Sequence, residues 1–243
     1  MIYKDAVYKH NACLLRPYSY NKQKGYDLMT KKVKITDVPI GKSIEAFEKK
    51  FTVLDHTDKG VLVLSESIET EMPFRDECEA RVAPNDFRDS DICRYLNGEY
   101  LDSLMNSTED ADAILDMEID LKCTLGQREY GTWKAKGGLL TLDQYGKYFD
   151  IIPKVDDCWW LATPYGTPLR SPYTNYSSSV WYVRTNGSYS NNYYGGSYGV
   201  RPALILDASL SVSCDDIPDD NTTQLSDFSD EDLLEEIKRR FKT

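Results

Sequence analysis

The chain has 243 residues, 41% of them hydrophobic, and a formal net charge of −11. This length and composition allow one large or two small domains with a true core, and they exclude a disordered chain. The negative balance would repel a phosphate backbone, so nucleic-acid binding is disfavoured. No window approaches the roughly 18 consecutive apolar residues of a membrane span, and the start shows no secretory signal. We expect a protein that is cytoplasmic when synthesised, although a protein associated with a phage particle would show the same features.

Cysteine and histidine are too scattered or too few to indicate a metal centre. The six cysteines form no Cys-x-x-Cys pair, and the only two histidines are His10 and His56. Zinc sites and disulfide frameworks are signalled by closely spaced ligand or cysteine pairs. The sequence therefore predicts reduced thiols, no metal and no other cofactor.

The first predicted core element is a hairpin. Residues 1–32 are rich in Tyr and Lys with weak periodicity, and we expect them to form an N-terminal extension with one strand near 12–15. Two β-branched and aliphatic runs follow at 51–55 and 60–66, separated by the polar residues HTDK. Such runs around a short connection predict a β-hairpin. This hairpin would begin the core of the main domain, which we expect over 33–207.

Two helices are predicted next, on either side of a short strand around 114–121. The first should run from about residue 90 to Met105, with Ser90 or Asp91 as its N-cap. Its apolar residues recur at near-helical spacing and are Ile92, Leu96, Tyr100 and Leu104. The second begins at a Thr141-x-x-Gln144 capping box and meets a stop signal at Pro153. Its apolar residues are Leu142, Tyr145 and Phe149.

The last third of the domain is rich in strand-forming residues. Strands are expected in CWWLATP, VWYV and YGVRPALIL, and Asn186-Gly187 predicts a hairpin turn because both residues tolerate positive φ. Beyond them we expect an acidic linker over 208–228 and a helix over 229–243. The acidic residues of that helix precede its basic ones, as the helix macrodipole favours. Its apolar stripe would need a covering surface, on its own domain, on another subunit or on a partner.

The segment 171–200 has an unusual composition between those strands. Of its 30 residues, 22 are Tyr, Ser, Asn or Gly. Tyr provides a large, rigid contact area at low entropic cost, and Ser, Gly and Asn adapt their hydrogen bonds, as in antibody binding loops. A polar hairpin with one buried and one wet face would also be rich in Tyr and Ser. The composition therefore indicates either a binding surface or an ordinary polar hairpin.

The strand motifs also carry a resemblance. With Trp159-Trp160, Trp181-Tyr182-Val183 and the Gly-Val-Arg-Pro-Ala-Leu run at 199–204, the chain resembles an uncharacterised bacterial and phage domain family from about Val38 to Asp207. The resemblance implies an α+β, C-type-lectin-like fold of the formylglycine-generating-enzyme type, with a mixed or antiparallel sheet and two main helices. Some members look like the variable proteins of diversity-generating retroelements, and 171–200 would be the display region.

Those retroelements mutate adenines, so the residues they scatter are those reachable from Asn codons, including Tyr, Ser, Asn, Gly, Asp and Thr. The composition of 174–179 and 188–197 matches that set. By this resemblance the Trp pair, Trp181, Tyr182, Val183 and 199–204 would be fixed scaffold. The predicted ligand-binding residues are Tyr173, Asn175, Tyr176, Ser178, Tyr189, Asn191, Asn192, Tyr193, Tyr194 and Ser197.

Enzymatic chemistry finds little support in the sequence. The related formylglycine-generating enzymes need two cysteines placed to bind copper, and the spacing of Cys158 and Cys214 does not match, so Cys158 is expected to be a buried core thiol. Asp156-Asp157 is expected to be a solvated turn and not a calcium site. Arg201 is expected to form a structural pair or to cap a loop. We predict no catalytic residue.

Two functions follow from this sequence. The first is a binding protein for an unknown protein or glycan, with a surface diversified by a retroelement. The second is a phage or prophage structural or assembly protein, in which a fixed lectin-like domain docks through the C-terminal helix on a partner or in an oligomer. Neither function involves nucleic acid or a membrane span.

Overall fold

The described residues form two main sheets, a separate two-stranded ribbon, one long helical stretch and a shorter helix. The computed structural model describes residues 32–76, 83–106, 111–168 and 177–214, all of which belong to the unit Lys31–Thr243. The strand predicted near 12–15, the C-terminal helix and all but the start of the acidic linker lie outside these residues. β-structure dominates the described residues and is combined with helices, which agrees with the α+β class. Among these residues, no helix is long and apolar enough to cross a membrane.

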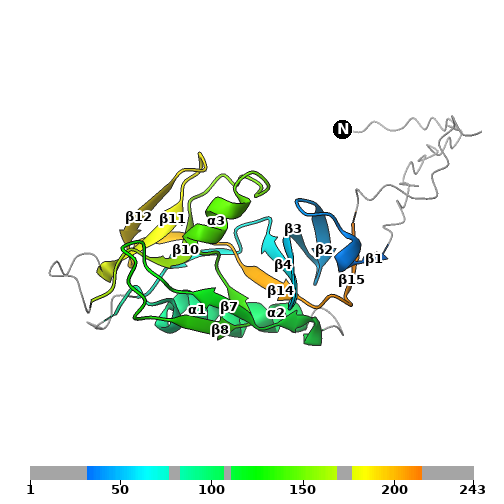
Figure 1. The fold of residues 1–243 in the computed structure, drawn as a ribbon, viewed down its shortest axis with the longest axis horizontal. Coiled ribbons are helices and arrows are strands. Elements are labelled where there is room, and N and C mark those ends of the chain that lie inside the picture. The colour runs from blue at the N-terminus through cyan, green and yellow to red at the C-terminus, as the bar shows by residue number, and fades with distance from the viewer. Residues whose placement is uncertain (1–31, 77–82, 107–110, 169–176, 215–243) are drawn as a thin grey trace, which may run out of the picture. The chain divides into compact units, whose positions relative to one another are not determined.

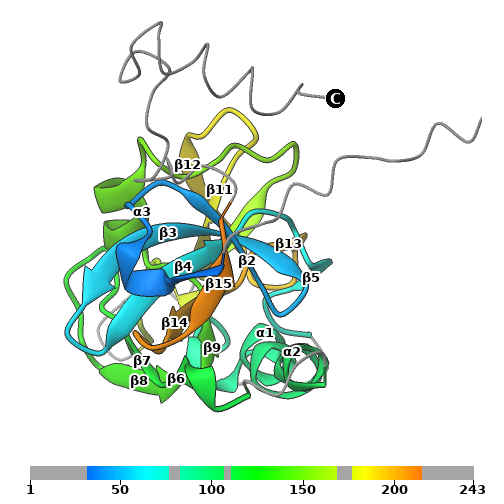
Figure 2. The ribbon, with the colours of Figure 1, turned by 90° about the vertical axis from the view of Figure 1, so that its right-hand side faces the viewer.

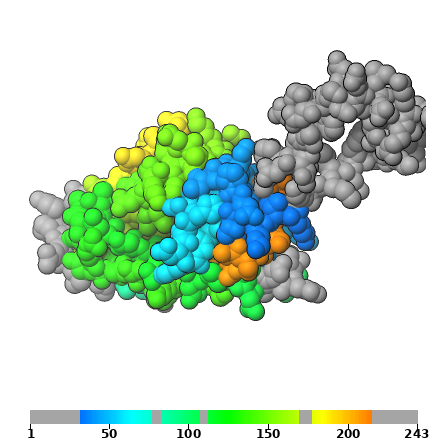
Figure 3. Space-filling view, turned by 45° about the vertical axis from the view of Figure 1, so that its right-hand side comes forward, coloured from blue at the N-terminus to red at the C-terminus, as the bar shows by residue number. Residues whose placement is uncertain are grey.

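The first sheet is antiparallel and contains the predicted hairpin of β3 and β4. Its strands in spatial order are β1 (Lys32–Lys34), β15 (Ser211–Ser213), β2 (Ser43–Ala46), β3 (Lys49–Thr57), β4 (Gly60–Ser65), β14 (Ala203–Leu206) and β6 (Ile114–Leu115), with β9 (Gly137–Gly138) also paired to β14. Thr57 pairs with Gly60, so the connection is shorter than the HTDK segment suggested. The first and last described strands are neighbours, as Figure 3 shows where the orange segment meets the blue one.

The second sheet is mixed. Its order is β12 (Tyr189–Tyr193), β11 (Ser179–Val183), β10 (Trp159–Pro164), β13 (Ser197–Val200) and β5 (Thr70–Pro73). Only β10 and β13 are parallel, and they meet at Trp159 and Gly199. Figure 1 shows β10, β11 and β12 at one end of the domain, with β2 and β3 at the other. A separate two-stranded ribbon consists of β7 (Met117–Asp120) and β8 (Thr132–Ala135).

A bent ribbon joins the two sheets. β4 continues into β5 and β13 continues into β14, so the same two chain segments pair in both sheets. At the bend, the Ser65 amide donates to the Pro202 carbonyl at 2.8 Å, and the Glu69 amide donates to the Val200 carbonyl at 3.0 Å. A Cβ at Gly199 would lie 2.8 Å from the Ile68 side chain, so this position needs glycine. The strand predicted in YGVRPALIL is therefore two strands that belong to different sheets.

The first predicted helix is confirmed, with a local change in its winding. It consists of α1 (Asp91–Tyr95), a π-helical turn at Leu96–Tyr100 and α2 (Leu101–Met105), and Figure 2 shows it beside the sheets. The Ser90 side chain accepts a hydrogen bond from the Cys93 amide at 2.9 Å, which makes Ser90 the N-cap. The four apolar residues spaced four apart are all buried. A π-turn winds more slowly than an α-helix, which compensates for the drift that four-residue spacing produces at 3.6 residues per turn.

The second predicted helix, α3 (Leu142–Tyr148), begins at the predicted capping box. The Gln144 amide donates to Thr141 Oγ1 at 3.2 Å, and the Thr141 amide donates to Gln144 Oε1 at 2.9 Å. The predicted apolar face was wrong at Phe149, which is 50% exposed because it lies past the last turn of the helix. Tyr145 and Tyr148 are the buried residues of α3.

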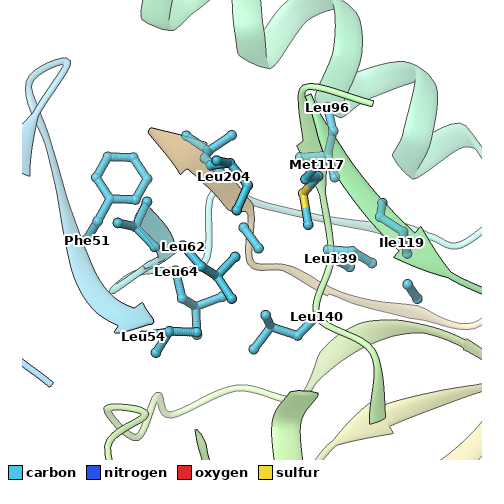
Figure 4. Packing of buried hydrophobic residues seen from close by; sticks show 14 of the residues in the cluster. Phe51, Leu54, Leu62, Leu64, Leu96, Met117, Ile119, Leu139, Leu140 and Leu204 are labelled. Carbon is cyan, nitrogen blue, oxygen red and sulfur yellow. The ribbon is translucent and has the colours of Figure 1, made fainter. Parts of the chain in front are cut away.

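One part of the hydrophobic core lies between the first sheet, the long helix and the β7 segment, and it continues into the second sheet. Figure 4 shows Phe51, Leu62, Leu64 and Leu204 of the first sheet on one side of this part and Met117 and Leu139 on the other, and all six are buried. Burial of side chains of this size stabilises the fold by about 1.5–3 kcal/mol each. The predicted short strand near 114–121 is confirmed as β6 and β7, which face this core through Ile114, Met117 and Ile119.

Candidate binding face

The predicted hairpin around Asn186-Gly187 is confirmed and carries most of the described display region. β11 and β12 pair from Ser179–Tyr193 to Val183–Tyr189, which leaves residues 184–188 as the loop. Within this loop only Gly187 has positive φ, at 82°, and its amide donates to the Arg184 carbonyl at 2.8 Å. The loop is therefore longer than the two-residue turn that Asn-Gly favours when both residues have positive φ.

One face of β12 is exposed. β12 is an edge strand, and its residues alternate between exposed and half-buried positions. Tyr189 is 55% exposed, Tyr193 is 41% exposed, and Asn191 between them is also exposed. Side chains two apart in a strand share a face, so these three side chains point the same way. Trp181 of β11, the register partner of Asn191, lies on that face as well. We name Trp181, Tyr189, Asn191 and Tyr193 the tyrosine face.

Trp181 holds the tyrosine face against the rest of the domain. Its ring makes an edge-to-face contact with Tyr189, with ring centroids 5.5 Å apart, and a tilted contact with Tyr165 at 5.7 Å. Its indole N–H donates to the Thr124 hydroxyl on a different segment. Aromatic pairs in such geometries add about 0.5–1.5 kcal/mol to the area they bury. The contact with Trp181 therefore restrains the exposed Tyr189 ring.

The opposite face of the same hairpin is scaffold. The rings of Tyr182 and Tyr198 are stacked with centroids 4.3 Å apart, and Trp160 packs edge-on against Tyr198 at 4.7 Å. Asn192 Nδ2 donates to the Tyr198 hydroxyl at 2.7 Å. Arg184 lowers the pKa of Tyr182 through a hydrogen bond, whereas burial raises the pKa of Tyr198. Asn192 thus lies among the scaffold residues and not on the tyrosine face.

Tyr194 does not lie on an exposed surface. It is 9% exposed and belongs to the hydrophobic core, so the prediction that it is displayed was wrong. Its backbone is also tied down, because its amide donates to the Ser178 carbonyl at 2.9 Å and its carbonyl accepts from the Arg75 amide at 3.2 Å. These bonds close the end of the hairpin. They position Tyr193 at the same time.

The remaining predicted residues are divided. Ser197 is exposed at the start of β13, opposite Pro73 of β5, and Ser178 is half-buried just before β11. Tyr173, Asn175 and Tyr176 lie outside the described residues. The structure therefore brings Tyr189, Asn191 and Tyr193 together and adds Trp181, which the resemblance had assigned to the scaffold. Trp181 is half-buried, so part of its ring lies on the tyrosine face and part packs against the scaffold.

The residues considered for chemistry are placed elsewhere. Cys158 is half-buried, not buried as predicted, because it precedes β10 where the sheet begins. Asp156 and Asp157 are exposed. Arg201 is fully buried at the bend between the sheets, where it donates to two backbone carbonyls. In the part of the chain that the structure describes, no three His, Cys, Asp or Glu side chains are grouped as metal ligands.

Comparison with known protein families matches part of the chain. Residues 135–208 match a family described as a domain of unknown function (DUF6273). The matched region covers α3 and runs from β9 to β14, so it includes the whole hairpin that bears the tyrosine face. Searches of curated proteins and of solved structures gave no significant match.

Proposed function

We propose that the chain is a binding protein without enzymatic activity, which presents the tyrosine face to a protein or a glycan. The observation that carries this proposal is the pair of exposed tyrosines on a paired edge strand, with a half-buried Trp beneath them. Exposed aromatic side chains on rigid backbone lose little entropy on binding and are frequent anchors of interfaces.

The chemistry of the face supports a macromolecular or sugar ligand. Its four residues carry no charge, and they combine three aromatic rings with one amide that both donates and accepts hydrogen bonds. Rings provide apolar contact area, whereas the Tyr hydroxyls and the Asn amide can match polar groups at its margin. Glycans and uncharged patches of protein surfaces carry both apolar and uncharged polar groups, so they could match this face.

We also propose that the domain is C-type-lectin-like and that Tyr189, Asn191 and Tyr193 of the tyrosine face are hypervariable. Three features support this. The motif strands of the resemblance coincide with β10, β11, β13 and β14. Tyr189, Asn191 and Tyr193, all residue types reachable from Asn codons, alternate along the exposed side of β12. Trp181 would stay fixed, and the other residues that hold the hairpin in place lie on its other side or at its ends. Variation of the three β12 residues would therefore leave the scaffold contacts intact.

The test is to sequence the genomic locus. The proposal predicts a nearby reverse transcriptase and a near-identical template repeat that differs from this gene at adenines, including those in the codons of Tyr189, Asn191 and Tyr193. Absence of both would reject the hypervariable surface and leave a binding domain of fixed specificity. The alternative assembly function depends on the helix predicted over 229–243, which lies outside the described residues.

A further inference from the structure

A second site candidate lies away from the tyrosine face. It is a cavity of about 200 Å³ bounded by α3 and the loop after it, the start of β10, and the turn of the β11–β12 hairpin. Figure 1 shows α3 beside β10 and β11 in this region. None of the four residues of the tyrosine face lines the cavity.

Aromatic rings form one wall of the cavity. Tyr145 makes edge-to-face contacts with Phe149 and with Trp159, with centroids 5.7 and 5.6 Å apart. The Tyr145 hydroxyl donates to the Gly187 carbonyl at 2.7 Å, which ties the hairpin turn to α3. The wall is therefore fixed before any ligand arrives, and preorganised walls reduce the entropic cost of binding.

The cavity is positively charged although the protein is not. Its lining includes Lys154, Arg184 and Arg201 but only one carboxylate, Asp150. The chain as a whole has a net charge of −11. Lys154 and Arg184 are exposed, whereas Arg201 is fully buried. An anion would thus meet two solvent-facing cations on the outside and a third one inside.

Arg201 is a buried cation without an ion-pair partner among the described residues. Its Nε donates to the Ser65 carbonyl at 2.7 Å, its Nη1 donates to the Pro153 carbonyl at 2.9 Å, and its guanidinium lies 5.2 Å from the centre of the Trp159 ring. Its Nη2 has no hydrogen-bond partner. Burial lowers the pKa of Arg201 to about 10, and the Glu66 carboxylate, which forms no ion pair with it, only partly opposes this shift, so Arg201 still carries its charge at neutral pH. Buried charges are costly unless they are paired, so an anion in the adjoining cavity would remove a cost that the free protein bears.

We propose that this cavity binds a small organic carboxylate, with its apolar body on the Tyr145–Trp159 wall and its carboxylate toward Arg201. The volume limits the ligand to about the size of a one-ring acid, since cavities for drug-sized ligands are larger, at roughly 300–1,000 Å³. The planar guanidinium suits a carboxylate because the two groups match in geometry. This site is independent of the proposed function, since it uses none of the residues of the tyrosine face.

Benzoate is a suitable probe, because it combines one ring with one carboxylate. Calorimetric titration of the full chain should show saturable binding of one benzoate per chain, with benzamide, which has the same shape and no charge, weaker by about tenfold or more. Acetate and inorganic phosphate keep the negative charge but lack the ring, so both should bind more weakly than benzoate. Equal binding of benzoate and benzamide, or no binding of benzoate, would overturn the proposal.

The location is tested with variants of exposed residues, since Arg201 also supports the bend and its replacement would disturb folding. The double variant Arg184→Gln with Lys154→Gln should lower the affinity for benzoate several-fold. The control Arg128→Gln with Lys134→Gln removes the same charges from exposed positions outside the cavity and should leave that affinity unchanged. Val155→Trp, which fills the cavity, should abolish binding. Equal losses in both charge variants, or full binding in Val155→Trp, would place benzoate elsewhere and refute the site.

Discussion

At the scale of single residues, Tyr193 and Tyr194 show how adjacent identical residues can differ in role. Tyr193 is 41% exposed and Tyr194 is 9% exposed. Their rings touch, with centroids 4.2 Å apart. Composition alone could not separate them, because both belong to the same Tyr-rich run. The separation comes from their places in the hairpin: Tyr193 ends β12 on its exposed side, whereas Tyr194 follows it and is held in the core by its backbone bonds to Ser178 and Arg75.

The two tyrosines should respond differently to replacement. Tyr189→Ala with Tyr193→Ala should change the free energy of unfolding by only about 1 kcal/mol, because both side chains are exposed to solvent, at 55% and 41%. Tyr194→Ala should cost about 3 kcal/mol, since it removes a buried aromatic ring. Urea unfolding of the three proteins measures both values. A cost for the double variant as large as that for Tyr194→Ala would mean that the exposed rings are core.

Glu48 is a residue whose conformation the sequence did not signal. Ala46 pairs with Lys49, so Phe47 and Glu48 form a two-residue turn in which both have positive φ, at 54° and 59°. Such turns favour Asn and Gly. The Phe47 ring is buried, which offsets the backbone strain. Glu48 is exposed and has no such compensation.

Glu48→Gly should therefore stabilise the protein by roughly 0.5–1 kcal/mol. Glycine removes the strain of the left-handed conformation, but part of this gain is lost because glycine gives the unfolded chain more conformational entropy. Thermal and urea unfolding would detect this increase. The control is Glu45→Gly in β2, which should destabilise, since strand interiors disfavour glycine. A loss of stability in Glu48→Gly would contradict the turn geometry.

At the scale of elements, α3 is attached to the first sheet by one carboxylate. Asp55 of β3 accepts hydrogen bonds from Lys147 Nζ and from the Tyr148 hydroxyl, both at 2.6 Å. The bond from Lys147 is the main reason that the pKa of Asp55 is lowered, and the bond from Tyr148 adds to it. α3 also carries the wall of the cavity, so this attachment positions the second sheet's hairpin through Tyr145.

The lowered pKa of Asp55 makes the stability of the protein depend on pH. A carboxylate with a depressed folded-state pKa contributes stability that is present above its ordinary pKa and is lost as the pH falls through the folded value. The free energy of unfolding of the wild-type protein should exceed that of Asp55→Asn by about 1 kcal/mol from pH 5 to 8, and the difference should shrink below pH 4. The difference is limited to this size because Lys147 is largely exposed, so solvent screens its ion pair with Asp55. Unfolding curves at several pH values measure this. Asp58→Asn in the β3–β4 turn is the charge control, and a pH-independent difference would contradict the assignment.

At the scale of the whole molecule, local signals predicted local structure. The β3–β4 hairpin, the cap at Ser90, the capping box at Thr141 and the hairpin at Gly187 each depend on a few neighbouring residues. The parallel contact of β10 with β13, the pairing of β1 with β15 and the bend at Arg201 depend on residues far apart in the chain. The hydrophobic periodicity of a segment does not indicate which distant segment it pairs with. The cavity escaped prediction for the same reason, because its lining comes from three separated segments.

The faces of β12 could not be assigned from sequence either. In the run Tyr-Ser-Asn-Asn-Tyr, both sides of the strand are polar or aromatic, so alternation of hydrophobicity is absent. What distinguishes the sides is the scaffold beneath one of them, where Tyr182 stacks on Tyr198 and Trp160 packs edge-on against Tyr198. We therefore predict that the residues on one side of this hairpin can be replaced freely, whereas those on the other side cannot.

Two matched libraries test that claim most directly. One randomises Tyr189, Asn191 and Tyr193 together, and the other randomises Tyr182, Asn192 and Tyr198 on the opposite side of the same region. The measurement is the fraction of members that stay folded, by resistance to protease, and then bind an immobilised protein or glycan. We predict that most members of the first library fold and that it yields binders, whereas most of the second unfold. Equal folded fractions in the two libraries, or no binders from the first, would contradict a separable binding face.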